Sequence, residues 1–191
     1  MEHHPIARLA QQTKQACRQG FPLAGRITYL DGVKTQQMKK GTQVFIPGPV
    51  RTPGSYSARI RVYNGDTLEI AQELQSRGLN PTVLNMANEE EAGGGFERGA
   101  RAQEEDLFRR SNYFQSLYRS ENYTFFFQRL LGYRIPEKGV IYSPCVQVFR
   151  ETQRKGYAYC APYAVDMIAC AAYNKRPSNG SWADRYRAQC T

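Results

Sequence analysis

Two short groups of residues in this 191-residue chain have types and a spacing that suit chemistry, Gly93-Gly94-Gly95 and, after seven intervening residues, Gln103-Glu104-Glu105. Because glycine has no side chain, the N–H groups of the first group can approach a ligand closely and form an anion-binding concavity for a pyrophosphate. The second group brings an amide and two adjacent carboxylates to the same place. Two carboxylates can divide the work of cleaving a glycosidic bond, because one can deliver a proton while the other stabilises positive charge.

Each group also has a plainer explanation. Three glycines are typical of a flexible turn, and a Glu-Glu pair is common in the first turn of a helix, where acidic side chains interact favourably with the helix dipole. From these residue types alone both explanations stay open.

The segments around these groups alternate between expected strands and helices. Alternating apolar residues predict short strands at 43–46 and 60–63. Asp66, before apolar residues at helical spacing, predicts a helix that ends near Gly78. The apolar run 82–87 predicts a strand buried on both faces of a sheet. The glycines then lie in the loop that follows this strand.

Further elements extend the pattern. We expect a short surface helix at 11–18 and a helix at 102–118 with the glutamates in its first turn. Strands are predicted at 139–142 and 147–149, whereas 164–172 fits a buried strand or a short helix. The alternation predicts an α/β sheet with helices on its faces and a ligand site beyond the carboxyl ends of its strands. The glycine loop occupies that position.

The length fits one domain with a sizeable core, with residues 1–25 as a helical or flexible start and 26–191 as the folded domain. Five cysteines without a C-x-x-C pair, and only two histidines, at positions 3 and 4, argue against a zinc site and a disulfide framework. We expect no metal and no cofactor. No signal sequence or long apolar run is present, which predicts a cytoplasmic protein without membrane contact, or a nuclear one in a eukaryotic or viral setting.

The net charge of +9 and the pI of about 9.4 attract polyanions in general, including nucleic acids and poly(ADP-ribose). Thirteen tyrosines and clusters such as Arg109-Arg110 would also suit a nucleic-acid-binding module, although no recognised nucleic-acid motif accompanies them. Charge therefore selects no single partner.

Taken together, the motifs resemble the central block of the microbial-type poly(ADP-ribose) glycohydrolases. The resemblance spans about 66 to 174, and the residues that carry it are Asp66-Thr67-Leu68, Val83 to Asn88, Gly93-Gly94-Gly95, Gly99-Ala100, Ala102 to Glu105, Leu107, Arg109, Ser111, Val140 to Pro144, Val146, Val148-Phe149-Arg150, Val165-Asp166 and Ala171 to Asn174. It implies a macrodomain-like three-layer α/β/α fold with a mixed sheet and ADP-ribose in a cleft at the strand ends.

The resemblance also implies roles for the site residues. The glycine loop would hold the diphosphate and the distal ribose, and Gln103, Glu104 and Glu105 would lie at the ribose–ribose bond. The second glutamate is the catalytic acid in this family, which gives that role to Glu105. Glu104 would position ribose hydroxyls, with Asn88 as another ribose contact.

The resemblance does not by itself fix the roles of two further residues, one aromatic and one amide. Phe96, directly after the glycines, would pack against the distal ribose, although a core role is commoner for phenylalanine. Asn85 stands where the animal-type glycohydrolases have an aspartate, in their Asp-Phe-Ala-Asn motif, and we assign it no role.

The expected reaction is hydrolysis of the ribose–ribose bond in poly(ADP-ribose), with an ADP-ribosylated protein as the other candidate substrate. Kept protonated by burial and by its neighbours, Glu105 would donate to the leaving 2′-oxygen and later take a proton from the attacking water. A catalytically silent ADP-ribose-binding module is the main alternative.

The chain departs from the family pattern at its C-terminus, because it ends at Thr191 before the last strand and a Gly-x-x-Gly-Cys-Gly-like loop. Residues 165–172 are apolar enough for a central strand that needs a neighbour on each side. We therefore expect one part of a longer or split protein, completed by a C-terminal segment or a second chain. A naturally reduced form is the other explanation.

Overall fold

The computed structural model describes residues 5–46, 48, 57–118 and 133–172. Its elements are α1 (Pro5–Gln19), β1 (Phe21–Leu23), β2 (Arg26–Thr28), α2 (Gly32–Gly41), β3 (Gln43–Phe45), α3 (Thr67–Ser76), β4 (Thr82–Ala87), the 3-10 turn η1 (Phe96–Arg98), α4 (Gln103–Arg110), α5 (Phe114–Leu117), β5 (Val140–Arg150), the 3-10 turn η2 (Gln153–Lys155) and β6 (Tyr159–Ala171).

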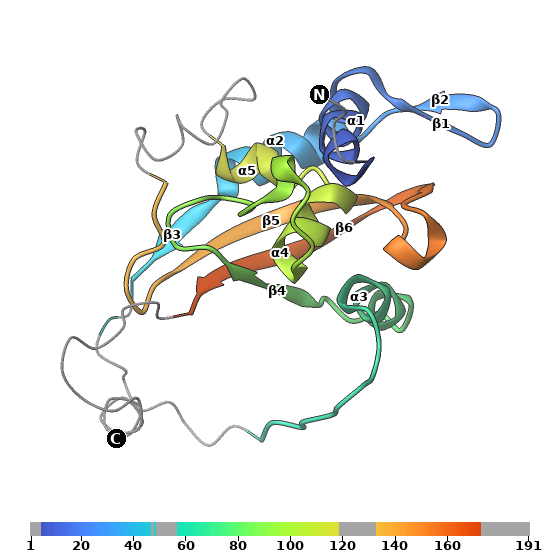
Figure 1. The fold of residues 1–191 in the computed structure, drawn as a ribbon. Coiled ribbons are helices and arrows are strands. Elements are labelled where there is room, and N and C mark those ends of the chain that lie inside the picture. The colour runs from blue at the N-terminus through green and yellow to red at the C-terminus, as the bar shows by residue number, and fades with distance from the viewer. Residues whose placement is uncertain (1–4, 47, 49–56, 119–132, 173–191) are drawn as a thin grey trace.

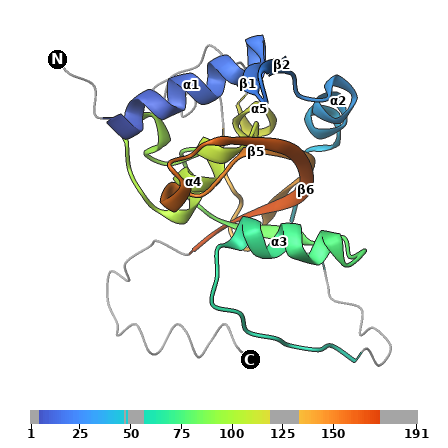
Figure 2. The ribbon, with the colours of Figure 1, turned by 90° about the vertical axis from the view of Figure 1, so that its right-hand side faces the viewer.

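A mixed four-stranded sheet in the order β3-β5-β6-β4 forms the centre of the molecule (Figure 1). β5 is antiparallel to both β3 and β6, while β4 runs parallel to β6. Figure 2 shows α1 and α5 on one side of the sheet and α3 on the other. The predicted α/β fold with a mixed sheet is thus confirmed.

β4 is buried on one face only, although the sequence predicted burial on both. Val83, Asn85 and Ala87 are buried, and the alternate residues Thr82, Leu84 and Met86 are exposed. Successive side chains of a strand point to opposite faces, and among the described residues β4 is the last strand of the sheet. Its second face is exposed among the described residues, where the sequence alone indicated a strand covered on both faces.

The helix predicted after Asp66 is confirmed as α3. The Asp66 carboxylate accepts hydrogen bonds from the N–H groups of Leu68 and Glu69 at 3.1 and 3.0 Å. At the other end Gly78 has a left-handed φ of 79°, and its N–H donates to the Gln75 carbonyl. Asp66 thus caps the first turn, and glycine permits the backbone reversal that leads into β4.

Three other sequence expectations change, and one alternative that the sequence left open is decided. Residues 60–63 form no strand and are exposed, because none of the described strands lies beside them. The helix expected at 102–118 is divided into α4 and α5, since Ser111 between them is extended and bridges to β5. The strands expected at 139–142 and 147–149 are one bulged strand, and 164–172 is strand rather than helix.

α1 is longer than the predicted surface helix and is packed into the fold. Ile6, Ala10, Thr13 and Ala16 are buried along one stripe. The Thr13 hydroxyl donates to the backbone carbonyl of Arg109 at 2.7 Å, which fixes α1 to the end of α4. The division at residue 25 stays a prediction.

Replacing Asp66 should destabilise the fold more than the loss of a helix cap explains. Asp66 also pairs with the buried guanidinium of Arg110, at 2.8 Å from Nη1. We expect Asp66→Ala to lower the free energy of unfolding by about 2 to 4 kcal/mol, because a lost cap costs about 1 kcal/mol and a buried charge loses one of its two carboxylate partners. Urea denaturation measures this.

Asp31→Ala is the matched control. The Asp31 carboxylate caps α2 by accepting hydrogen bonds from the N–H groups of Val33 and Lys34, just as the Asp66 carboxylate caps α3. It should cost only about 1 kcal/mol, and equal losses for the two variants would show that the Asp66–Arg110 pair contributes nothing.

Candidate active site

Three consecutive side chains at the start of α4 each bind a different piece of the neighbouring backbone. The Gln103 side chain binds the edge of β4, where its Oε1 accepts from the Met86 N–H at 2.9 Å and its Nε2 donates to the Leu84 carbonyl at 2.6 Å. The Gln103 amide thus makes, with the backbone of β4, one donated and one accepted hydrogen bond, as the backbone of a neighbouring strand would. These bonds anchor the first turn of α4 beside the end of β4.

Glu104 is almost fully buried and accepts three hydrogen bonds. Its Oε1 accepts from Asn85 Nδ2 at 3.2 Å and from the Gly93 N–H at 3.1 Å, and its Oε2 accepts from the Asn88 N–H at 2.8 Å. Glu104 thereby ties the start of α4 to both the end of β4 and the glycine loop. Both of its oxygens are occupied within the protein.

Glu105 is equally buried but is bound on one oxygen only. Its Oε1 accepts from the Gly95 N–H at 2.8 Å, whereas its Oε2 is buried without a hydrogen-bond partner. A buried polar atom without a partner is rare, since it loses hydration without compensation. Of the two neighbouring glutamates, Glu105 is the one with an unoccupied oxygen.

The glycine loop is shaped by these carboxylates. The N–H groups of Gly93, Gly94 and Gly95 donate to Glu104, to the Glu91 carbonyl and to Glu105. In this arrangement none of the three points into an open anion cradle, so the pyrophosphate role of the loop stays a prediction.

Each of the three positions also requires glycine for space. A Cβ at Gly93 would lie 2.6 Å from the Phe108 ring, and one at Gly94 would lie 2.5 Å from Glu105 Oε1. At Gly95 it would lie 2.5 Å from the Cβ of Ala100. The glycines thus permit the close approach of α4 itself, in addition to any ligand.

The remaining predicted site residues lie around the same loop. The Asn88 side chain accepts from the N–H groups of Glu90 and Glu91, so it shapes the turn before the glycines. Phe96 is 1% exposed, and its ring lies 5.7 Å from that of Phe108. This burial favours the core role for Phe96 over a ribose contact.

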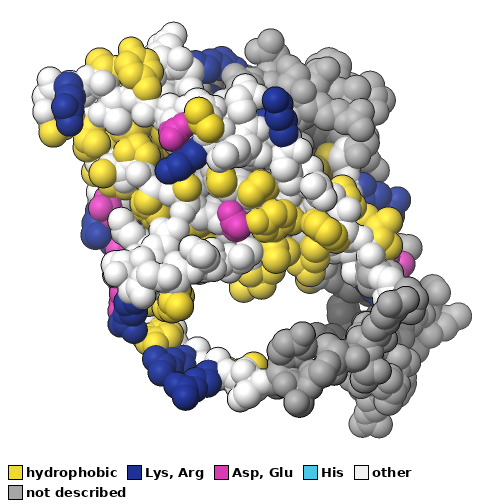
Figure 3. Space-filling model, turned by 180° about the vertical axis from the view of Figure 1, so that it is seen from behind, with side chains coloured by type: hydrophobic (Ala, Val, Ile, Leu, Met, Phe, Trp, Pro, Cys, Tyr) yellow, Lys and Arg dark blue, Asp and Glu magenta, His cyan; other side chains and the backbone are white. Residues whose placement is uncertain are grey.

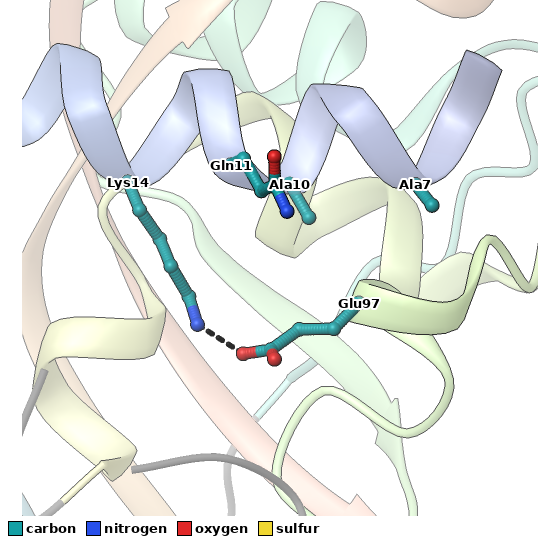
Figure 4. A pocket seen from close by; sticks show the side chains of 5 residues that line it. All are labelled: Ala7, Ala10, Gln11, Lys14 and Glu97. Atoms are coloured by element: carbon teal, nitrogen blue, oxygen red, sulfur yellow. Dashed lines mark hydrogen bonds and ion pairs between the residues drawn. The ribbon is translucent and has the colours of Figure 1, made fainter. Parts of the chain in front are cut away.

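α1 supports the loop from outside, a contact the sequence analysis missed. Figure 4 shows Lys14 of α1 and Glu97 of η1 joined by an ion pair beside a cavity of about 100 Å³. On the inner side, the buried Arg109 guanidinium donates to the backbone carbonyls of Ala100 and Phe96. The segment between the glycines and α4 is thus held from both sides.

Asn85 joins the site, although the sequence analysis assigned it no role. It is fully buried and donates to Glu104, but its Oδ1 lacks a partner, as does the nearby buried hydroxyl of Tyr113. Alternation along β4 could have identified Asn85, because it places residue 85 on the same face as the buried Val83.

Burial raises the pKa of Glu104 from its ordinary value of 4.5 to about 7, despite the opposing effect of its hydrogen bonds from Asn88, Asn85 and Gly93. Desolvation disfavours the charged carboxylate. Near neutral pH the pair of adjacent glutamates therefore includes one carboxyl that is partly protonated.

The part of the chain that the structure describes contains no cluster of three or more metal-binding side chains. Its four cysteines, at positions 17, 145, 160 and 170, are free thiols. Within the same residues, no helix has both the length and the apolar character needed to cross a membrane.

The family model of the microbial-type PARG catalytic domain matches residues 10–151, which include most of α1, the glycine loop and both glutamates. The chain belongs to this family. The match begins well before the resemblance seen in the sequence alone, which started at residue 66. A comparison with curated proteins gave no match.

Solved structures agree with this membership. Poly(ADP-ribose) glycohydrolase from Thermomonospora curvata is 30% identical, with a TM-score of 0.68 over 88% of this chain and 64% of that chain. The enzyme from Deinococcus radiodurans, solved in complex with ADP-ribose, is 28% identical, with a TM-score of 0.55 over 76% of this chain and 60% of that one. The chain therefore spans less than two thirds of the length of these relatives.

Glu104 should make the stability of the fold depend on pH. The pKa of Glu104 is about 7 in the folded protein, against an ordinary value of 4.5. The stability that the protonated Glu104 carboxyl contributes is therefore fully present below pH 4.5 and is lost as the pH rises through about 7. The loss corresponds to about 3 kcal/mol. We expect Glu104→Gln, which cannot ionise, to remove this part of the pH dependence of the free energy of unfolding.

Urea denaturation across this pH range measures the effect, with Glu137→Gln, a change at an exposed glutamate, as the control. If wild type and Glu104→Gln differ by the same free energy at every pH, the raised pKa is refuted.

A methyl group at Gly94 should disturb the site through Glu105. Gly94 and Gly25 both have positive φ, 50° and 77°, but an added Cβ at Gly25 meets nothing within 4 Å. We expect Gly25→Ala to cost about 1 kcal/mol for the left-handed backbone alone, and Gly94→Ala to cost at least about 1 kcal/mol more. Equal losses in urea denaturation would contradict the close packing of Glu105 on the loop.

Proposed function

We propose that this chain hydrolyses the ribose–ribose O-glycosidic bond of poly(ADP-ribose) and releases ADP-ribose, with Glu105 as the general acid and base. The observation that carries this proposal is the pair of buried glutamates at the start of α4, held by the glycine loop, in which Glu105 keeps one oxygen free. Membership of the microbial-type PARG family supports it, as does the likeness to a glycohydrolase crystallised with the inhibitor ADP-HPD.

The proposed reaction needs one proton donor that later acts as a base. The carboxyl of Glu105 donates its proton to the leaving 2′-oxygen while the bond from that oxygen to the anomeric carbon breaks. Water then attacks the oxocarbenium-like carbon, and the Glu105 carboxylate takes the proton that the water loses. The products are ADP-ribose with a new anomeric hydroxyl and a polymer with a free 2′-hydroxyl.

Glu104 has a different part in this proposal. Because both of its oxygens accept bonds from Asn85 and from backbone N–H groups, we assign it to holding the loop and Glu105 in place. Because burial raises its pKa to about 7, Glu104 is partly protonated near neutral pH, which limits the repulsion between the two neighbouring carboxylates. Contacts from Glu104, Gln103, Asn88 and the glycines to ribose or phosphate remain part of the proposal.

A silent ADP-ribose-binding module would use the same cleft without turnover. The internal bonds of all three glycine N–H groups bear on both functions alike, since a ligand phosphate must displace them in either case. Binding of ADP-ribose without its release from polymer would identify this second function. A cytoplasmic location, and a completing segment or second chain as partner, stay predictions.

Glu105→Gln should abolish hydrolysis while the fold is kept. Loss of a general acid typically reduces the rate on the order of a hundredfold to ten-thousandfold. The measurement is release of ADP-ribose from auto-modified ADP-ribosyl transferase, on polymer and on mono-modified protein, with binding of ADP-ribose measured by calorimetry in parallel.

Glu73→Gln, at an exposed position of α3, is the control and should retain the wild-type rate. Wild-type release by Glu105→Gln would refute the assignment of Glu105, and absence of release by the wild-type chain that binds ADP-ribose would refute the hydrolase proposal itself.

A further inference from the structure

The surroundings of the glycine loop are rich in negative charge. The segment from Asn88 to Glu105 carries six glutamates and two arginines, Arg98 and Arg101. The N–H groups of the three glycines are bound within the protein, so they do not by themselves supply an open anion site. The diphosphate of an ADP-ribose unit is itself negative and would be repelled here unless a cation lay beside the loop.

The net charge of +9 does not meet this need by itself. Figure 3 shows Lys and Arg side chains dispersed over the back of the molecule, between hydrophobic and uncharged groups. Dispersed charge attracts polyanions in general, without fixing the position of any one phosphate. Recognition of a phosphate at the site therefore requires a cation with a defined place beside the two buried glutamates.

Arg98 has such a place. Its guanidinium binds Glu91, which precedes the glycines, with Nη1 2.5 Å from Oε1 and Nη2 3.0 Å from Oε2. Nη2 also lies 3.5 Å from the Gly94 carbonyl oxygen. An added Cβ at Gly94 would lie 2.5 Å from Glu105 Oε1. Gly94 is therefore next to both the Arg98 guanidinium and the Glu105 carboxyl.

Electrostatic interactions agree with this placement. The hydrogen bond to Glu91 raises the pKa of Arg98, against a smaller lowering by burial, and the charges of Glu97 and Glu105 raise it further. Glu105 is thus close enough for its charge to act on Arg98. Glu91 is itself fixed, because its side chain is only 13% exposed and its backbone carbonyl accepts from the Gly94 N–H. The guanidinium is therefore held beside the loop before any ligand binds.

We propose that Arg98, held in place by Glu91, binds a phosphate of the ADP-ribose unit whose glycosidic bond is cleaved at Glu105. A guanidinium presents five N–H donors and pairs with carboxylate and phosphate in the same bidentate way, so one arginine can bind both groups. Because Glu91 orders the side chain beforehand, little further conformational entropy is lost on binding. This proposal rests on the proposed function, since it requires an ADP-ribose unit at the glycine loop.

Two substitutions in the same ion pair should change the binding of ADP-ribose in opposite directions. Arg98→Ala removes the cation and should weaken binding about tenfold or more, as expected for the loss of charge-assisted hydrogen bonds. Glu91→Gln keeps an oxygen that accepts from Arg98 but removes a negative charge, so it should strengthen binding about two- to fivefold. Isothermal titration calorimetry of the full chain with ADP-ribose measures both, and both differences from wild type should shrink as the salt concentration rises.

Arg77→Ala and Glu73→Gln are the matched controls, since Arg77 and Glu73 form a half-exposed ion pair at the end of α3. Both should keep the wild-type affinity. Arg98→Lys retains the charge without the planar fork and should weaken binding by less than Arg98→Ala. It takes the place of Arg98→Ala if circular dichroism shows that this variant does not fold.

Equal weakening by Arg98→Ala and Glu91→Gln would show that the pair only supports the loop, and would overturn the proposal. So would an unchanged affinity of Arg98→Ala for ADP-ribose, including the case in which this variant loses affinity only for a single-stranded RNA. These results differ from failure of the proposed hydrolysis, in which the chain releases no ADP-ribose from polymer although the affinities change as expected.

Discussion

The site depends on hydrogen bonds from the backbone of a glycine loop to two buried carboxylates. Gly93 and Gly95 donate to Glu104 and Glu105, so a flexible segment and the first turn of α4 fix each other. A buried carboxylate is costly unless donors satisfy it. Glu104 has three donors and Glu105 only one, and this inequality separates their roles, because it leaves a free oxygen on Glu105 alone.

The rest of the fold keeps this arrangement in place. Gln103 anchors the same helical turn to the edge of β4, and Arg109 holds the carbonyls of the segment between the glycines and α4. On the outside, α1 reaches the loop through Lys14. At the far end of α4, Arg110 joins Asp66, the cap of α3. Contacts from α1, α3 and β4 to α4 and the glycine loop thus determine the positions of Glu104 and Glu105.

Local sequence features predicted what short-range physics decides, such as the capped helix after Asp66. Long-range packing decided the rest. Nothing local at 60–63 reveals that no described strand pairs with it, and nothing local in β4 reveals that only one of its faces is covered by the described residues. The role of Asn85 required knowing which face of β4 meets α4. Burial raises the pKa of Glu104 to about 7, an effect that the sequence alone did not predict, since burial depends on the assembled fold.

Amide hydrogen exchange of the glycine loop, resolved by NMR, tests most directly whether carboxylates position this loop. We expect protected N–H groups at Gly94 and Gly95 in the wild type, and loss of protection at Gly95 alone in Glu105→Ala, because the Gly94 N–H donates to the Glu91 carbonyl instead. Unchanged exchange at Gly95 in that variant, or rapid exchange at both glycines in the wild type, would contradict it.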